Sequence, residues 1–458
     1  MFASKDKALA FYKDGDYEKA LPLLMELYDA NAKNKRDASI NQWIGVCLYN
    51  LSNNTKDAVP YLKYASSKNI QESYIYLAKL AFLDYNFKDV DVLLAEYDAF
   101  VAKTKNGKES NLAKEFKIEY NKVKIMLSYV EQVAVIDSLV VDKDDFFKAY
   151  KIVAECGSLN SAEILPNGYG DSSTSVVFAN ESKSRLIWGE QNDNGMVRIY
   201  ETTKLIGDKW SDKVIIGDNM AESDADINFP YLMPDGSTIY FATNGQGSIG
   251  GYDIFVSMKD IDSGSYYQPQ NMGMPYNSIY DDYMMVVDEF TGVGWWATDR
   301  NKLGDKLTIY IFTPNAVRQN YNPDRDDIAM LAKVNAIKDT WVNGTDYSSV
   351  LKNIEDIKPA EVKVEVDFYL PISRGVMYNW FTDFKSAEAK NIAYGWVELT
   401  KKFEAEELAL KALRATYANA SDTEKINMSN EIIAKEREIE RLRVDIRNKV
   451  NAIIRAEK

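Results

Sequence analysis

The stretch Met233–Ser257, MPDGSTIYFATNGQGSIGGYDIFVS, holds two strand-like runs that flank a glycine-rich bend. A Pro-Asp-Gly turn precedes the first run, Thr238–Thr243, and the bend Gly245–Gly251 leads directly into the second run, Tyr252–Ser257. A phosphate-binding loop needs a strand, then the glycines, then the N-terminus of a helix. Because a strand follows the glycines here, we interpret the bend as a loop between two strands and not as a phosphate site.

The same arrangement occurs three times, and this repetition predicts the fold of the central region. Four columns of residues recur at a spacing of 55: Asp171, Asp226 and Asp281; Val177, Leu232 and Val287; Ile199, Ile254 and Ile309; Tyr200, Phe255 and Tyr310. Each unit contains about four short strands, which is the pattern of a β-propeller blade.

Three clear units are fewer than the roughly four blades that a propeller usually needs for closure. The run Val133–Val141 can supply an earlier strand, and Val362–Pro371 and Gly375–Phe381 can supply later ones. We therefore expect a small or irregular propeller over residues 130–382, completed by segments from both ends.

Residues 1–129 show a helical period in which proline is scarce, and related units are visible within them. Gly45 and Ala78 are 33 residues apart, close to the roughly 34-residue period of tetratricopeptide repeats. Small residues at such positions let paired helices approach, while aromatic residues such as Trp43 fill the space between pairs. We expect an array of paired helices, capped by a longer helix over Asn111–Tyr129. The alternative is a generic array of helical hairpins.

Residues 383–458 return to a helical pattern, and residues 317–360 contain a shorter helical insertion with a turn at Asn343-Gly344. Four isoleucines in the C-terminal segment recur every seven residues: Ile432, Ile439, Ile446 and Ile453. A capping box over Ser421–Glu424 predicts the start of a second long helix. We expect an antiparallel coiled-coil hairpin. The alternative is an amphipathic pair of helices that lies on the propeller.

Composition excludes several classes of function. The 458 residues carry a formal net charge of −14, from 55 Lys and Arg against 69 Asp and Glu, which argues against general binding to nucleic acids or to an anionic membrane surface. The absence of histidine excludes Ser-His-Asp and Cys-His catalysis within the chain, and also His-ligated zinc. Cys47 and Cys156 form neither a disulfide framework nor a CxxC pair, and we interpret Cys47 as a buried apolar residue.

The sequence gives no sign of a membrane span or of a signal peptide. No run approaches the roughly 18 apolar residues of a membrane-spanning helix. The N-terminal residues Met1–Leu21 carry charges at once and lack the apolar core of a signal peptide. The protein is therefore either cytoplasmic or a mature chain whose leader was removed, and composition does not choose between the two.

Two acidic stretches are candidates for chemistry. A hard cation such as calcium prefers carboxylate oxygens. The first stretch offers four of these side chains: Asp218, Glu222, Asp224 and Asp226. The EF-hand spacing is absent, however, and Asp226 belongs to the 55-residue columns, which favours a turn-capping role. Tyr276–Glu289 combines carboxylates and aromatic residues, as sugar-binding surfaces and glycosidases do, but no pair of carboxylates stands out. We assign no catalytic, cofactor-binding or metal-binding residue.

Four tryptophans lie at strand positions of the central units: Trp188, Trp210, Trp295 and Trp296. We interpret them as core residues between sheets. The alternative is that some of them are exposed and form a recognition patch.

Phe229–Phe255 resembles the PD40, or WD40-like, β-propeller repeat of TolB-type proteins, with the Pro-Asp-Gly turn, an Ile-Tyr-Phe strand and Gly-Gly-Tyr-Asp-Ile before the next strand. The neighbouring units keep the strands and lack Pro-Asp-Gly. About 95 N-terminal residues resemble tetratricopeptide repeats, although only the second unit carries the Trp43 and Gly45 of that motif. The combination is similar to envelope proteins of Gram-negative bacteria, some of them lipoproteins and some associated with secretion machinery. Many relatives add a C-terminal OmpA-like peptidoglycan-binding domain, which we do not recognise here.

The resemblance implies a periplasmic or outer-membrane-associated protein with protein partners in the envelope, and it leaves open a lipid anchor upstream of Phe2. We expect an α+β multidomain, non-enzymatic scaffold or accessory subunit of an outer-membrane or secretion complex. It would present helical-repeat, propeller and coiled-coil surfaces and need no cofactor. The alternative is a carbohydrate-binding or carbohydrate-processing envelope protein that uses propeller carboxylates and aromatic residues.

Overall fold

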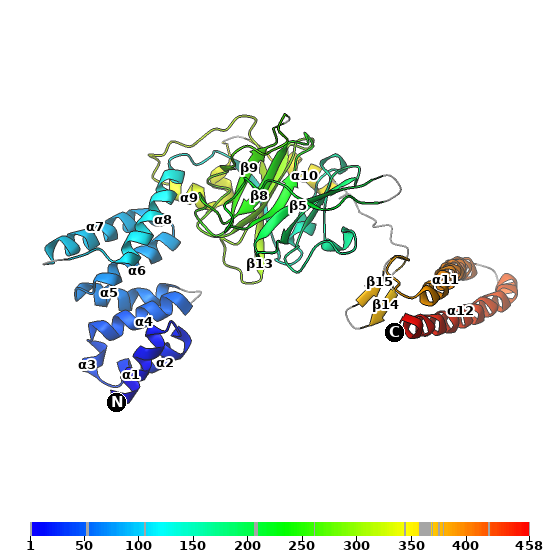
Figure 1. Ribbon diagram of the computed structural model, residues 1–458, viewed down its shortest axis with the longest axis horizontal. Coiled ribbons are helices and arrows are strands. Elements are labelled where there is room, and N and C mark those ends of the chain that lie inside the picture. Colours follow the sequence, from blue (N-terminus) through cyan, green and yellow to red (C-terminus); the bar gives the residue numbers. More distant parts are fainter. Residues whose placement is uncertain are drawn as a thin grey trace. The chain divides into compact units, whose positions relative to one another are not determined.

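The computed structural model describes residues 2–51, 55–104, 107–205, 209–260, 262–342, 345–356, 368, 370–373, 376–378, 380–419 and 422–457. These residues form N-terminal helices, a central region of antiparallel sheets and a C-terminal pair of helices (Figure 1). At this level the order predicted from the sequence is confirmed. The chain divides into two compact units, Met1–Val362 and Lys363–Lys458.

The N-terminal helices are α1 (Phe2–Lys13), α2 (Tyr17–Asp29), α3 (Ala32–Lys35), α4 (Ala38–Leu51), η1 (Thr55–Ala58), α5 (Val59–Ser67), α6 (Gln71–Leu83), α7 (Phe87–Lys103) and α8 (Asn111–Leu127). Packed pairs include α1 with α2, α4 with α5, and α6 with α7. Gly45 brings α4 so close to α5 that a Cβ atom there would lie 2.6 Å from Leu62 Cγ. Side chains of Asp16, Asn86 and Ser110 accept hydrogen bonds from backbone N–H groups at the starts of α2, α7 and α8.

The central strands are β1 (Ala134–Asp142), β2 (Ser158–Asn160), β3 (Val177–Ala179), β4 (Arg185–Gln191), β5 (Val197–Thr203), β6 (Val214–Ile215), β7 (Ile227–Leu232), β8 (Thr238–Thr243), β9 (Asp253–Met258), β10 (Gln270–Asn271), β11 (Asp282–Asp288), β12 (Val293–Thr298) and β13 (Lys306–Thr313). They form three antiparallel sheets with the orders β2-β3-β4-β5-β6, β10-β9-β8-β7 and β1-β13-β12-β11. The first sheet contacts the second through β4 and β7, and the second contacts the third through β8 and β11. Within the described part of the chain, the sheets do not close into a barrel or a propeller.

One sheet corresponds to one sequence unit. The isoleucine column lies in β5, β9 and β13 and is fully buried: Ile199, Ile254 and Ile309. Each of these isoleucines pairs with a small residue on the neighbouring strand: Gly189, Ala242 and Ala297. The repeated spacing therefore reflects a repeated strand register in which a large residue faces a small one.

Strand β1 confirms that the run Val133–Val141 supplies a strand, because it pairs along β13 and extends the third sheet. The chain then passes to the first sheet through η2 (Phe146–Ala149) and η3 (Ala154–Cys156), with η4 (Ala162–Ile164) after β2. The hydroxyl of Tyr150 donates to Met284 O at 3.0 Å. Residues 143–157, here called the crossing segment, share one apolar core with all three sheets.

The helical insertion packs onto the sheets. Its elements are α9 (Ile328–Lys333), η5 (Ile337–Thr340) and α10 (Ser348–Asp356). Trp341 Nε1 donates to Val135 O at 2.7 Å, and Ile354 joins the core of the sheets. The predicted turn at Asn343-Gly344 lies outside the described residues.

A shared apolar core joins the helices to the sheets. Ile249 of the glycine-rich bend is 5% exposed and packs with buried residues of α6, α7 and α8. The hydroxyl of Tyr280 donates to Leu83 O at 3.2 Å, and Lys122 Nζ donates to Ser248 O at 3.3 Å. The bend is thus also the contact point between the sheets and the helices.

The second unit has its own strands, β14 (Leu370–Ser373) and β15 (Val376–Tyr378), which pair only with each other in the described residues. The expectation that Val362–Pro371 and Gly375–Phe381 add strands to the central sheets is therefore wrong for Leu370, Pro371 and Val376–Tyr378. Phe368 and Leu370 are instead buried with Trp396 of α11. Residues 362–367, 369, 375 and 379 of the two predicted runs lie outside the described residues.

Helices α11 (Ala387–Asn419) and α12 (Asp422–Glu457) form a hairpin. Their directions are antiparallel, because Lys402 pairs with Glu438 at 3.0 Å while Glu406 pairs with Lys435 at 2.6 Å. Ile439 and Ile453 of the seven-residue pattern are buried, and the other two isoleucines are half-buried. Ser421 of the predicted capping box lies outside the described residues.

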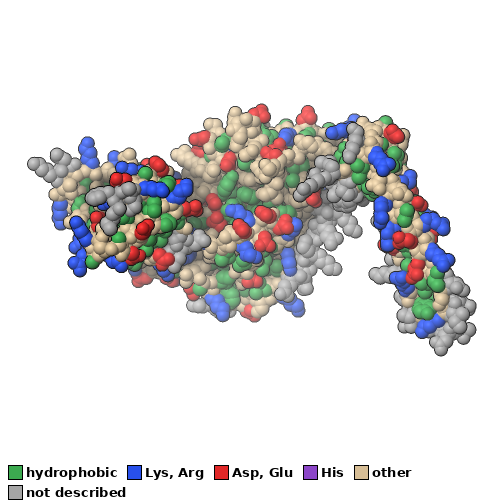
Figure 2. All heavy atoms as spheres, turned by 90° about the horizontal axis from the view of Figure 1, so that it is seen from below, with side chains coloured by type: hydrophobic (Ala, Val, Ile, Leu, Met, Phe, Trp, Pro, Cys, Tyr) green, Lys and Arg blue, Asp and Glu red, His purple; other side chains and the backbone are tan. Residues whose placement is uncertain are grey.

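Acidic and basic side chains are interspersed on the face of the molecule shown in Figure 2. Among the described helices, none is both long enough and apolar enough to cross a membrane. Cys47 and Cys156 are buried and unpaired with each other, which confirms the interpretation of Cys47 as a buried residue.

Candidate functional site

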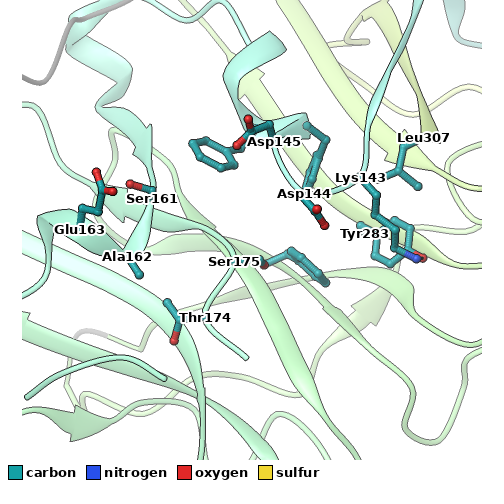
Figure 3. A pocket seen from close by; sticks show the side chains of 13 residues that line it. Lys143, Asp144, Asp145, Ser161, Ala162, Glu163, Thr174, Ser175, Tyr283 and Leu307 are labelled. Atoms are coloured by element: carbon teal, nitrogen blue, oxygen red, sulfur yellow. The ribbon is translucent and has the colours of Figure 1, made fainter. Parts of the chain in front are cut away.

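A cavity of about 510 Å³ lies between the crossing segment, the connection from β2 to β3, and the strands β7, β11 and β13. The crossing segment contributes residues 143–147, and the connection between β2 and β3 contributes Ser161–Glu163, Thr174 and Ser175 (Figure 3). The second sheet contributes Phe229, and the third contributes Tyr283 and Leu307. The volume falls in the range of small-molecule sites, roughly 300–1,000 Å³.

Phe229 and Tyr283, two of the aromatic residues that line the cavity, lie at shifts in strand register in the second and third sheets. The register of β7 against β8 shifts around Phe229, and that of β11 against β12 shifts around Tyr283. Phe229 has a φ of 54°, a left-handed conformation that costs a residue with a side chain roughly 1–2 kcal/mol. Bulges of this kind redirect side chains and are common near functional sites. Here they turn two aromatic rings toward one cavity.

The rings form a continuous cluster with the crossing segment. The ring centroids of Phe229 and Tyr283 are 5.4 Å apart, and that of Phe146 lies 5.9 Å from Phe229. All three residues are less than one-tenth exposed. The cavity therefore has a rigid apolar floor.

Tyr283 connects this floor to a group of charged residues. Lys143 Nζ donates to the hydroxyl oxygen of Tyr283 at 2.8 Å, and Lys143 lies along the Tyr283 ring (Figure 3). The same hydroxyl lies 3.3 Å from Asp281 Oδ2 and 3.3 Å from Asp299 Oδ2. Burial, followed by the charges of Asp281 and Asp282, raises the pKa of Asp299 to about 6.

Burial and the two nearby carboxylates raise the pKa of Tyr283 well above its ordinary value. The phenol is therefore protonated at neutral pH and serves as a hydrogen-bonding group rather than as a nucleophile. The arrangement can hold and orient a polar ligand beside an apolar floor.

The aspartate column has a repeated structural role. Asp226 Oδ1 accepts a hydrogen bond from Val197 N at 2.8 Å, and Asp281 Oδ1 accepts one from Tyr252 N at 2.7 Å. Each carboxylate thus ties its own sheet to the preceding one. In the first sheet, Asp171 accepts from backbone N–H groups of its own sheet region instead.

The acidic stretch around Asp226 is not assembled into a cation site. Glu222 Oε2 accepts a hydrogen bond from Gln246 N at 3.0 Å, away from the bond that Asp226 makes. Across the described ranges, no three or more Asp, Glu or Cys side chains are grouped so that they could hold a metal ion. The four predicted candidates, Asp218, Glu222, Asp224 and Asp226, are therefore not brought together.

Two N–H groups of the glycine-rich bend bind the strand that follows it. Ile249 N and Gly250 N each donate to the carboxylate of Asp253 at 3.1 Å. A Cβ atom on Gly250 would lie 2.1 Å from Tyr280 O, so this glycine permits a close approach of two backbones. The bend is followed by β9, as expected for a loop between strands.

Three of the four tryptophans are fully buried, which confirms the core interpretation for Trp188, Trp295 and Trp296. Trp210 is half-buried and packs beside the core of the first sheet. Within Tyr276–Glu289, Tyr276, Asp282 and Tyr283 are all buried, and of these three only Tyr283 lines the cavity.

Sequence reasoning missed most of the cavity. Lys143–Phe147 lies between the predicted strands and belongs to no repeated column. The only available signal was its composition, in which Asp144 and Asp145 directly precede two phenylalanines.

No family model matches the chain, and comparison with curated proteins and with solved structures gives no match either.

Proposed function

We propose that the protein is a non-enzymatic scaffold or accessory subunit that binds protein partners in a bacterial envelope complex, either periplasmic or associated with the outer membrane. The observation that carries this proposal is a recessed row of aromatic side chains along the first helices of successive helical pairs.

This aromatic row consists of Tyr12 in α1, Trp43 and Tyr49 in α4, and Tyr76 in α6, all half-buried. The Tyr12 and Trp43 ring centroids are 6.3 Å apart, and those of Tyr49 and Tyr76 are 5.3 Å apart. Burial, with a contribution from Glu119 of α8, raises the pKa of Tyr49 to about 12. Burial also raises the pKa of Tyr12 and of Tyr76. Partly exposed rings with desolvated hydroxyls are typical anchors for a bound peptide or helix.

The order of modules supports the same proposal. We interpret the helices as tetratricopeptide-like repeats, the three sheets as PD40-type blades in an open, propeller-like arrangement, and α11 and α12 as a coiled-coil arm. Support comes from the matching of one sheet to one 55-residue unit and from the Asp235 turn, whose carboxylate accepts hydrogen bonds from Ser237 N and Thr238 N. Helices and sheets that share a core would hold two binding surfaces in fixed geometry.

The test is recovery of partners by the tagged chain from detergent-solubilised envelopes, read by mass spectrometry. We compare the wild type with Tyr49→Ala/Tyr76→Ala and with Tyr267→Ala, which removes a tyrosine that is 57% exposed on the sheets. A partner recovered in stoichiometric amount should persist with Tyr267→Ala and fall about tenfold or more with the double variant. Equal recovery with the double variant, despite an unchanged circular dichroism spectrum, would overturn the proposal.

Carbohydrate binding is the second candidate, because carboxylates and aromatic rings meet at the central cavity. Its support is weaker: the fully buried tryptophans cannot stack on a sugar, and the lining rings are less than one-tenth exposed. Binding of the purified chain to a glycan array, without recovery of any envelope protein, would favour this candidate.

A further inference from the structure

We propose that the central cavity is a binding site for an organic cation, meaning an alkylammonium or guanidinium group carried on an apolar stem. This inference does not depend on the scaffold proposal, since it rests on the charge and shape of the cavity alone.

The charge balance of the lining favours a cation. Asp144, Asp145 and Glu163 contribute three carboxylates, and Lys143 contributes one ammonium group. Lys143 is already bound to the Tyr283 hydroxyl, and Asp145 pairs with Lys148 at 2.8 Å. For Asp144 and Glu163, no ion pair is found in the described part of the chain.

Two further carboxylates lie next to Tyr283, which lines the cavity. Asp281 Oδ2 and Asp299 Oδ2 each lie 3.3 Å from the Tyr283 hydroxyl. Burial, followed by the charges of Asp281 and Asp282, raises the pKa of Asp299, and the charge of Lys143 opposes this rise. A second cation in the cavity would relieve the same repulsion.

The polar and apolar parts of the cavity suit the two ends of such a ligand. In Figure 3 the carboxylate of Asp144 points into the space between Tyr283 and Ser175. Thr174 and Ser175 add polar side chains to the same part of the lining. Phe146, Phe229 and Leu307 offer an apolar surface to methylene groups.

Other ligand classes fit less well. An anion would meet three carboxylates at the rim, and a neutral sugar would lack an exposed aromatic face for stacking. The cation can be the side chain of a lysine or arginine in a bound polypeptide, or a free polyamine. Both sources present the same chemistry to the cavity.

The experiment measures binding to the full chain by calorimetry at low salt. The probes are 1,5-diaminopentane, its uncharged analogue 1,5-pentanediol, and a capped Gly-Lys-Gly peptide. The diamine or the lysine peptide should bind, and the diol should not. Tighter binding of the peptide would indicate that the natural ligand is a polypeptide side chain. Tighter binding of the diamine would indicate that it is a polyamine.

The variant Asp144→Asn/Glu163→Gln should weaken cation binding about tenfold or more, because it removes the two rim carboxylates for which the described residues show no ion pair. Asp142→Asn is the matched control, since Asp142 is an exposed carboxylate near the crossing segment and outside the lining. The proposal fails if neither amine binds at millimolar concentration, if the diol binds equally well, or if the double variant binds as the wild type does. Such a failure would leave the scaffold proposal untouched.

Discussion

Asp282 and Arg300 form an ion pair whose side chains are 0% and 1% exposed, with Arg300 Nη2 2.8 Å from Asp282 Oδ1. Arg300 also donates to the carbonyl oxygens of Pro275 and Tyr276 and to the Thr298 hydroxyl, and Asp282 Oδ2 accepts from Ser278. A buried pair held by several hydrogen bonds is costly to break, because either charge alone is left desolvated.

We therefore predict that Arg300→Met lowers the free energy of unfolding by about 3–5 kcal/mol. The control is Lys306→Met, which breaks the exposed pair of Lys306 with Asp142 in the same sheet and should cost less than about 1 kcal/mol. Urea denaturation of the three proteins measures the difference. Equal losses for the two variants would show that the buried pair is not structurally important.

Asp299 should make stability depend on pH. Its pKa of about 6 in the folded protein lies above the ordinary value of 3.8. The folded state therefore keeps this proton over a range in which the unfolded chain has released it, and stability falls as the pH rises from about 4 to about 6. Asp299→Asn removes this effect and can still accept the hydrogen bond from Asp281 N.

We predict that Asp299→Asn gains stability relative to the wild type as the pH rises across that window and that the gain is constant above it. Thermal unfolding at intervals of half a pH unit between 4 and 8 gives the curve. Asp142→Asn controls for the loss of one exposed carboxylate. A difference between Asp299→Asn and the wild type that does not change with pH would contradict the assignment.

At the scale of elements, the glycine-rich bend illustrates what a short stretch can and cannot predict. The strand after the glycines identifies a loop, and the structure agrees. The second role of the bend, its contact with the helical array through Ile249, depends on residues far away in the chain and leaves no local mark. The crossing segment is a similar case. It has no counterpart in the other 55-residue units, so the repeat does not predict the cavity that its residues line.

The bend also gives a prediction about coupling between elements. Alanine at Gly250 would force the bend away from Tyr280 O, because a Cβ atom would lie 2.1 Å from it. We expect Gly250→Ala to lower the free energy of unfolding by about 1–3 kcal/mol and to speed amide hydrogen exchange in α8. Gly236→Ala is the control, since Gly236 has open space around its Cβ position but a φ of 73°. It should cost a similar amount and leave exchange in α8 unchanged.

At the scale of the whole molecule, the sequence predicts the order of modules well, because long helices and a 55-residue period are strong signals. It fails for Leu370, Pro371 and Val376–Tyr378, because a short apolar run does not show which sheet it will join. Strand pairing is a non-local choice, and Phe368 and Leu370 are fixed by Trp396, more than twenty residues further along the chain.

The two compact units, Met1–Val362 and Lys363–Lys458, should fold independently of each other. The apolar core around Trp396 is built from residues between 368 and 456, whereas the core of the sheets extends to Ile354. We expect removal of residues 363–458 to shift the unfolding midpoint of the remaining chain by less than about 2 °C. Residues 363–458 alone should show a helical circular dichroism spectrum that is lost cooperatively on heating. If residues 1–362 aggregate or melt much earlier, while the intact chain gives a single calorimetric transition, the two units fold as one and the separate cores are not independent.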